Sequence, residues 1–148
     1  MNHLKLYLTT LILLGFMLIL SMGSGIWGSK TGFGQFTYEL FSGVCHQIPD
    51  RTYHLNGQPM AVNSRCFGIF LGMFISWCLI PVYKNLNIKR SAAVTVLLFA
   101  AGLQIIDYIG NLMQLWENTN HSRAALGGFL GLVSVTVIAD LFSTKNKN

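Results

Sequence analysis

Charged residues are scarce in this chain, and their scarcity excludes most classes of soluble protein. Only 10% of the 148 residues are Asp, Glu, Lys or Arg, and 52% are hydrophobic, whereas about a quarter of the residues of a typical soluble domain are charged. The mean hydropathy is +0.50. This composition predicts one integral membrane domain that covers residues 1–148.

Several signals of known chemistry are also missing. The sequence contains no P-loop, no GxSxG nucleophile elbow, no HExxH zinc motif and no dinucleotide-binding fingerprint. The net charge of +5 comes from basic residues scattered at segment ends, without a basic stripe interleaved with aromatic residues. The lipid bilayer is therefore the expected partner and nucleic acid is not, while the sequence names no protein partner and leaves open whether the protein is an enzyme.

Apolar runs of about the length that crosses a bilayer, roughly 20 helical residues, occur four times. They cover residues 4–22, 66–83, 91–110 and 124–142. The sequence therefore predicts an all-α fold, a four-span transmembrane helix bundle. For the first run a cleavable signal peptide is the alternative, because small residues follow it, although the length of the run favours a retained span.

Residues 23–65 are predicted to form a loop outside the membrane, with one short helix in it. Apolar residues recur at helical spacing over residues 33–44, at Phe33, Phe36, Leu40, Phe41 and Val44. This pattern predicts an amphipathic helix that lies on the membrane surface before the second span. Such a helix brings Cys45 to the level of the lipid headgroups.

Basic residues predict the orientation. With both termini cytoplasmic, the inner side holds Lys5, Lys84, Lys89, Arg90, Lys145 and Lys147, and the outer side holds Lys30, Arg51, Arg65 and Arg123. Because loops rich in Lys and Arg stay in the cytoplasm, we expect a multi-pass protein of the cell (inner) membrane with both termini inside and residues 23–65 outside.

Reactive side chains are concentrated between Cys45 and Gly72, a segment with two of the three cysteines, two of the four histidines and two of the four arginines. Asp107 lies near the outer end of the third predicted span, and Arg123 precedes the fourth. We therefore expect one layer of polar groups in the outer leaflet. Its members are Cys45, His46, Arg51, Arg65, Cys66, Asp107, Asn111 and Arg123.

The arginines of this layer suit an anionic ligand. An ionisable group at membrane depth is costly without a partner, so Asp107 is expected to pair with Arg65 or Arg123. Guanidinium groups bind carboxylates and phosphates through two parallel hydrogen bonds. A small anion or an anionic lipid headgroup is the candidate ligand of Arg51, Arg65, Asp107, Asn111 and Arg123; a structural ion pair and arginines that extend to the interface are the alternatives.

The cysteines allow three interpretations. Cys45, His46 and Cys66 offer thiolate and imidazole ligands for a transition metal such as zinc or copper. A Cys45–Cys66 disulfide, which an oxidising exterior favours, is equally compatible with the sequence. A redox-active thiol pair, as in a membrane thiol-disulfide oxidoreductase, is the third interpretation. Cys78 lies deep in the second run and is predicted to be a buried, inert thiol.

Glycine pairs predict a close helix contact beneath this layer. Gly68 and Gly72 begin the second run, and Gly127 and Gly131 begin the fourth. Glycines four residues apart let two helix backbones approach closely. We therefore expect the second and fourth helices to pack against each other.

The polar motifs, taken together, resemble those of a known family. They are Cys45-His46-Gln47-x-Pro49-x-Arg51-Thr52, Ser64-Arg65-Cys66-Phe67-Gly68-Ile69-Phe70-x-Gly72, Asp107, and Thr119-Asn120-x-x-Arg123. From Cys45 to Gly131 the chain resembles small multi-pass membrane proteins of bacteria and archaea, a family of unknown function. The resemblance implies a polar site on the outer face and brings no established activity. Asn63 stands where the family usually has a cysteine, which weakens a cysteine-rich metal site and leaves Cys45 and Cys66 as the natural pair.

Overall fold

A computed structural model of the chain describes residues 3–28, 32–83 and 90–143, and these are mostly helical. The helices are α1 (His3–Trp27), α2 (Gly32–Ser42), the 3-10 turn η1 (Pro49–Arg51), α3 (Ser64–Cys78), α4 (Ile80–Tyr83), α5 (Arg90–Leu112) and α6 (Asn120–Ser143). The strands β1 (His54–Leu55) and β2 (Gln58–Pro59) form a small antiparallel hairpin. The prediction of a mostly helical chain is confirmed.

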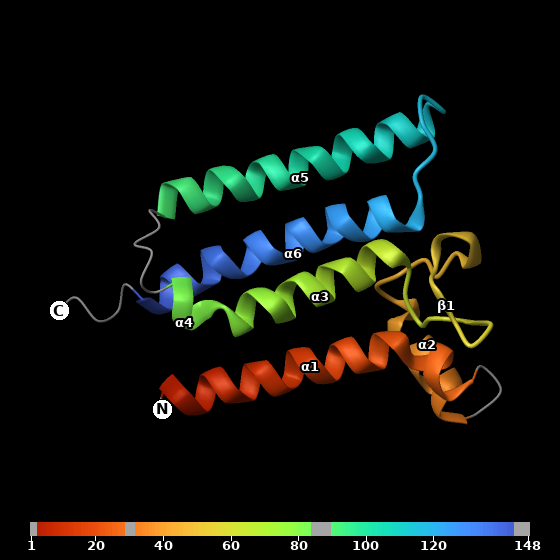
Figure 1. Cartoon of the computed structure of the whole chain (residues 1–148), viewed down its shortest axis with the longest axis horizontal. Helices are drawn as coiled ribbons and strands as arrows, with labels where there is room; N and C mark the ends of the chain where they lie inside the picture. The colour runs from red at the N-terminus through yellow and green to blue at the C-terminus, as the bar shows by residue number, and fades with distance from the viewer. Residues whose placement is uncertain (1–2, 29–31, 84–89, 144–148) are drawn as a thin grey trace.

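The four long helices lie side by side in the spatial order α5, α6, α3, α1 (Figure 1). The order in space differs from the order in the chain because α3 and α6 form the central pair. The start of α1 and the end of α6 lie at one end of the bundle, and α2, the hairpin and their loops lie at the other (Figure 1). We call the end with α2 and the hairpin the loop end.

Three of the described helices are long and apolar enough to cross a membrane, namely Leu4–Trp27, Ser91–Leu112 and Asn120–Ile138. The helix expected over residues 66–83 is not one long span, because α3 has only 15 residues and the chain turns at Leu79 before α4. Pro81 explains the break, since a proline within a continuous helix removes a hydrogen bond and clashes with the preceding turn. The fourth span is therefore not confirmed by length.

The predicted loop over residues 23–65 begins later and is more ordered than expected. α1 continues to Trp27 through Gly23, whose φ of 8° and ψ of −100° are not helical. A Cβ atom at Gly23 would lie 2.2 Å from Thr37 Oγ1, so glycine here lets α1 contact α2. The helix predicted over residues 33–44 is present as α2, and the hairpin was not predicted.

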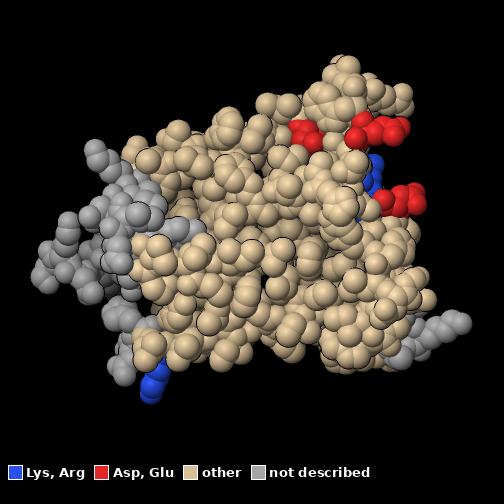
Figure 2. Space-filling model, viewed as in Figure 1, with Lys and Arg blue, Asp and Glu red and all other residues tan. Residues whose placement is uncertain are grey.

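Apolar side chains cover the sides of the bundle. On the face shown in Figure 2, charged atoms gather toward the loop end, apart from one basic group at the opposite end. Exposed large hydrophobic residues are numerous on α1 and α5, for example Ile12, Leu98 and Phe99. This distribution suits a helix bundle surrounded by lipid. Several basic residues used for the orientation lie outside the described residues, namely Lys30, Lys84, Lys89, Lys145 and Lys147.

The backbones of α3 and α6 are in contact through glycines, as the glycine spacing predicts. A Cβ atom at Gly72 would lie 2.2 Å from the carbonyl oxygen of Gly128, and one at Gly127 would lie 2.2 Å from that of Arg65. Gly68 and Gly131 make equally close approaches, to Ala124 and Ile69. The predicted glycine packing is confirmed, and it sets the start of α3 directly beside the start of α6.

We expect Gly72→Ala to lower the free energy of unfolding by about 1–3 kcal/mol, the usual cost of an overpacked contact. Gly102→Ala on α5 is the matched control, because a Cβ atom there meets nothing within 4 Å and alanine favours a helix over glycine by up to about 1 kcal/mol. Thermal unfolding of the purified protein in detergent measures both. Equal midpoints for the two variants would contradict the contact.

Candidate functional site

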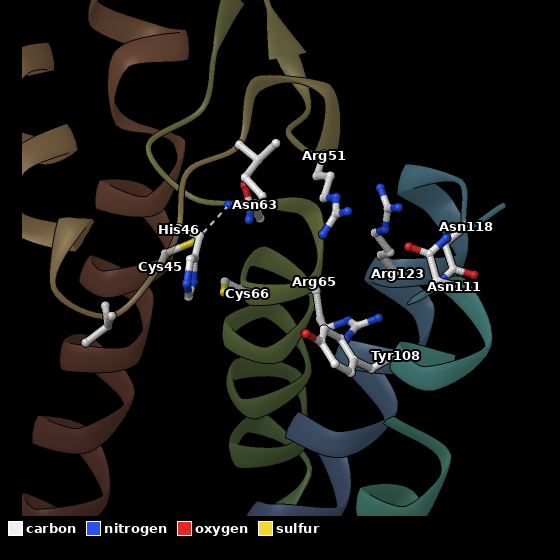
Figure 3. A pocket seen from close by; sticks show the side chains of 12 residues that line it. Cys45, His46, Arg51, Asn63, Arg65, Cys66, Tyr108, Asn111, Asn118 and Arg123 are labelled. Carbon is white, nitrogen blue, oxygen red and sulfur yellow. Dashed lines mark hydrogen bonds between the residues drawn. The ribbon is translucent and has the colours of Figure 1, made fainter. Parts of the chain in front are cut away.

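A cavity of about 290 Å³ lies at the loop end of the bundle (Figure 3). It is lined by Val44, Cys45, His46, Ile48, Arg51, Asn63, Arg65, Cys66, Tyr108, Asn111, Asn118 and Arg123. These residues come from the loop after α2, from η1, and from the ends of α3, α5 and α6 that meet there. Every residue of the predicted polar layer lines this cavity except Asp107, which contacts Arg65.

The buried side chain of Gln47 fixes the loop that carries Cys45 and His46. Its amide nitrogen donates hydrogen bonds to the carbonyl oxygen of Tyr38 at 2.6 Å and to that of Ala61 at 2.8 Å. The first carbonyl belongs to α2 and the second to the segment just before α3. The loop is thereby tied to both elements, and Cys45 is brought to the start of α3.

Polar contacts also hold the turn η1, which carries Arg51, against α3 and α6. The hydroxyl of Ser64 lies 3.0 Å from the carbonyl oxygen of Arg51 and 3.2 Å from Asn120 Oδ1. The hydroxyl of Tyr53 donates to the carbonyl oxygen of Asn120 at 3.1 Å. The loop region therefore rests on the adjoining starts of α3 and α6 and forms one wall of the cavity.

Three arginines from different elements reach the same side of the cavity (Figure 3). Arg65 forms an ion pair with Asp107 of α5, so Arg65 and not Arg123 is the partner of this carboxylate. The amide of Asn118 donates to the same Asp107 oxygen at 2.8 Å. The carboxylate of Asp107 therefore holds Arg65 in place from outside the cavity.

The remaining positive charge in this part of the cavity is not balanced. Within the described ranges neither Arg51 nor Arg123 has an ion pair, and the charges of Arg51 and Arg65 repel that of Arg123. Arg65 Nε is buried and has no hydrogen-bond partner among the described residues. The residues that line the cavity include three arginines and no carboxylate, so the cavity carries an excess of positive charge.

Cys45 and Cys66 are neighbouring thiols on the other side of the cavity. The Cys66 side chain packs against the apolar cluster that contains Cys45, and the backbone N–H of Asn63 donates a hydrogen bond to Cys45 Sγ at 3.2 Å. The neighbouring Cys66 thiol and this hydrogen bond lower the pKa of Cys45 to about 6, although burial opposes them. Both residues are free thiols in this structure, so the alternative of a Cys45–Cys66 disulfide is not the state seen here.

The structure gives no support to the transition-metal site, which is one of the three interpretations of Cys45, His46 and Cys66. Nowhere in residues 3–28, 32–83 and 90–143 does a group of three or more His, Cys, Asp or Glu residues lie close enough to hold a metal ion. Cys45 is buried whereas the adjacent His46 is exposed, although both line the cavity.

Asn111 lies where the sequence predicts, but other lining residues were not predicted. The Asn111 amide donates to the carbonyl oxygen of Trp116 at 3.2 Å. Asn63, Tyr108 and Asn118 also line the cavity and were not in the predicted set. Nothing in the polar segment 111–123 sets Asn118 apart from its neighbours, so only the fold reveals its contact with Asp107.

Comparison with known proteins identifies relatives without a described activity. The chain is 30% identical over 119 residues to an uncharacterized protein of Methanocaldococcus jannaschii, a match that covers 78% of this chain and 76% of the relative. It is 36% identical over 103 residues to an uncharacterized protein of Methanothermobacter thermautotrophicus, covering 66% of this chain and 88% of the relative. No solved structure matches significantly.

The family resemblance noted in the sequence is confirmed by a family model. The model described as "Predicted membrane protein (DUF2085)" matches residues 45–137, which include the cavity and most of the helix bundle. The protein is thus a membrane protein of unknown function with several apolar helices, and it belongs to the DUF2085 family of predicted membrane proteins.

Proposed function

We propose that this protein spans the cell membrane four times and that its cavity, on the outer face, binds a small ligand with a carboxylate or phosphate group. One observation carries the proposal: three arginines line a cavity that no carboxylate lines, and only one of them has an ion pair within the described residues. Guanidinium groups without a protein partner are free to bind an anion.

The position of α3 supports a fourth span. Although α3 is short, it lies between α1 and α6 along the same direction (Figure 1), so it occupies the same layer of the membrane as they do. Its 15 residues extend about 22 Å at 1.5 Å per residue, and α4 lengthens this path. A short helix within a bundle is tolerated because the bilayer thins locally or flanking residues reach the interface.

The arrangement of the ends supports an outward-facing cavity. α1 begins and α6 ends at the end opposite the cavity (Figure 1). The sequence prediction assigns six of the ten basic residues to the side of the termini, which favours a cytoplasmic location for that side. On α2, at the loop end, Phe33, Phe36 and Leu40 are exposed, as expected for a helix that lies on the membrane surface.

In the proposed orientation the cavity lies at the level of the lipid headgroups, where headgroups and water-soluble anions both have access. Asp107 neutralises part of the charge of Arg65, so Arg51 and Arg123 are the groups available to a ligand. A lipid phosphate and a free phosphate present the same oxygen atoms to a guanidinium fork. A lipid headgroup and a free anion can therefore both supply the ligand, and they differ in whether binding requires a bilayer.

We expect inorganic phosphate to raise the thermal midpoint of the detergent-solubilised protein above that in chloride at equal ionic strength, because a ligand that binds only the folded state stabilises it. The combined variant Arg51→Gln, Arg123→Gln should lose this shift. Lys5→Gln is the matched control, because it removes an exposed positive charge at the opposite end.

A lipid source gives a different pattern in the same variants. Stabilisation that depends on Arg51 and Arg123 in nanodiscs with phosphatidylglycerol, but not with phosphate in detergent, would identify a headgroup as the ligand. Equal midpoints for the native protein and the combined variant under every condition would refute the anion site.

Asp107 is proposed to orient Arg65. We expect Asp107→Asn and Arg65→Gln each to destabilise the protein, because each leaves a polar partner in a half-buried ion pair without its counter-charge. The double variant should lose less than the sum of the two losses, with a coupling of about 0.5–3 kcal/mol. Unfolding midpoints of the four proteins measure this coupling, and strictly additive losses would argue against the pair.

The proposed orientation predicts which segments are reachable from outside the cell. In a variant whose three native cysteines are replaced by alanine, Asp50→Cys should react with a membrane-impermeant maleimide on intact cells, because Asp50 is exposed near the cavity. Lys84→Cys, in the basic segment before α5, should react only after permeabilisation. Labelling of Lys84→Cys on intact cells, with Asp50→Cys protected, would reverse the orientation.

A further inference from the structure

Cys45 and Cys66 line the same cavity as the arginines, but the binding of an anion does not require them. Cys45 is 5% exposed and Cys66 is half-buried, yet both line the cavity. Both side chains belong to one packed apolar cluster. A ligand in the cavity therefore meets two adjacent thiols as well as three arginines.

Cys78 shows that this environment is specific to the pair. Cys78 was predicted to be buried, but its side chain is exposed at the end of α3, where its neighbours Ser76 and Trp77 are the residues turned inward. Cys78 does not line the cavity. Cys78 can therefore be replaced without changing the lining of the cavity.

We propose that Cys45 and Cys66 undergo thiol–disulfide exchange with a small organic disulfide that carries carboxylate or phosphate groups, which the arginines of the cavity hold. This inference rests on the proposed anion site and names its substrate class. The thiols and the arginines line opposite sides of one cavity (Figure 3), so one small molecule can contact both.

The exchange balances without any further oxidant. The Cys45 thiolate attacks one sulfur of the substrate disulfide, the substrate S–S bond breaks, and the leaving thiolate takes a proton from water. Cys66 Sγ then loses its proton to solvent and attacks Cys45 Sγ, which breaks the mixed disulfide and releases the second half of the substrate as a thiol. Two cysteine thiols are oxidised to one disulfide, and one substrate disulfide is reduced to two thiols.

The hydrogen bond from the Asn63 backbone assigns the first attack to Cys45. Its sulfur accepts this hydrogen bond at 3.2 Å, and an N–H donor favours the thiolate, which is the reactive form. The charged and titratable groups that line the same cavity are His46, Arg51, Arg65, Tyr108 and Arg123. Cys66 is the second nucleophile, which attacks the mixed disulfide on Cys45.

Three aliphatic disulfides of similar size and different charge test the inference. They are dithiodipropionate, with two carboxylates; hydroxyethyl disulfide, without charge; and cystamine, with two ammonium groups. Each is added to the reduced, detergent-solubilised Cys78→Ser protein. The rate of intramolecular disulfide formation is followed by intact mass, as the loss of two hydrogen atoms.

Each rate is divided by the rate of the same disulfide with free mercaptoethanol, because the leaving thiols of the three probes differ in pKa. We expect this relative rate to be highest for dithiodipropionate and lowest for cystamine, with a difference on the order of tenfold or more. The combined variant Arg51→Gln, Arg123→Gln in the same background should remove most of this difference. Cys66→Ala should stop at a mixed disulfide on Cys45, because no second thiol is present to resolve it. Cys45→Ala should leave Cys66 unreacted over the same time.

The outcomes separate this inference from the proposed function. Failure of all three probes to form a Cys45–Cys66 disulfide would refute the exchange, and equal relative rates for the three would refute the anionic substrate class. Stabilisation by phosphate is measured in the same Cys78→Ser protein. Phosphate stabilisation without exchange therefore refutes this inference alone.

Discussion

The contact between the backbones of α3 and α6 is the constraint on which the cavity depends. The glycines of both helices let carbonyl oxygens of one helix lie where side chains of the other would otherwise be. In lipid, where apolar burial gives no driving force between helices, such close van der Waals packing is the main source of association. Because the contact begins at Arg65 and Ala124, it brings Arg65 and Cys66 beside Arg123 without any long connection.

The loops form the rest of the cavity wall, and buried hydrogen bonds, instead of a large apolar core, hold them against α3 and α6. Gln47 joins α2 to the segment before α3, and Ser64 and Asn120 join η1 to the starts of α3 and α6. Buried polar groups with satisfied hydrogen bonds fix one arrangement more sharply than apolar contacts do. Arg51, on an exposed turn, is thus held in a defined position opposite two arginines of the bundle.

Features that depend on residues close together in the chain could be predicted from the sequence. Features that depend on contacts between distant residues could not. Apolar runs located the long helices, and glycine spacing identified the partners α3 and α6. Two differences from the prediction have local causes. A turn at Asn56 and Gly57, both with positive φ as such turns require, forms the hairpin, and Pro81 explains the early end of α3. Choosing Arg65 as the partner of Asp107, and excluding His46 from the thiol pair, required side-chain directions that spacing alone does not give.

The charge of the arginines on one side of the cavity affects the reactivity of the thiols on the other side. A thiolate at Cys45 brings a negative charge beside the proposed anion site, and two negative charges in one cavity repel each other. The three guanidinium groups exceed the one carboxylate that pairs with Arg65 and the one thiolate, so the cavity stays positive when Cys45 is ionised. The unpaired Arg51 and Arg123 therefore have a second effect besides holding a ligand, because they allow an anionic molecule to approach an ionised sulfur. A cavity with only Arg65, neutralised by Asp107, would repel the same molecule as soon as the nucleophile formed.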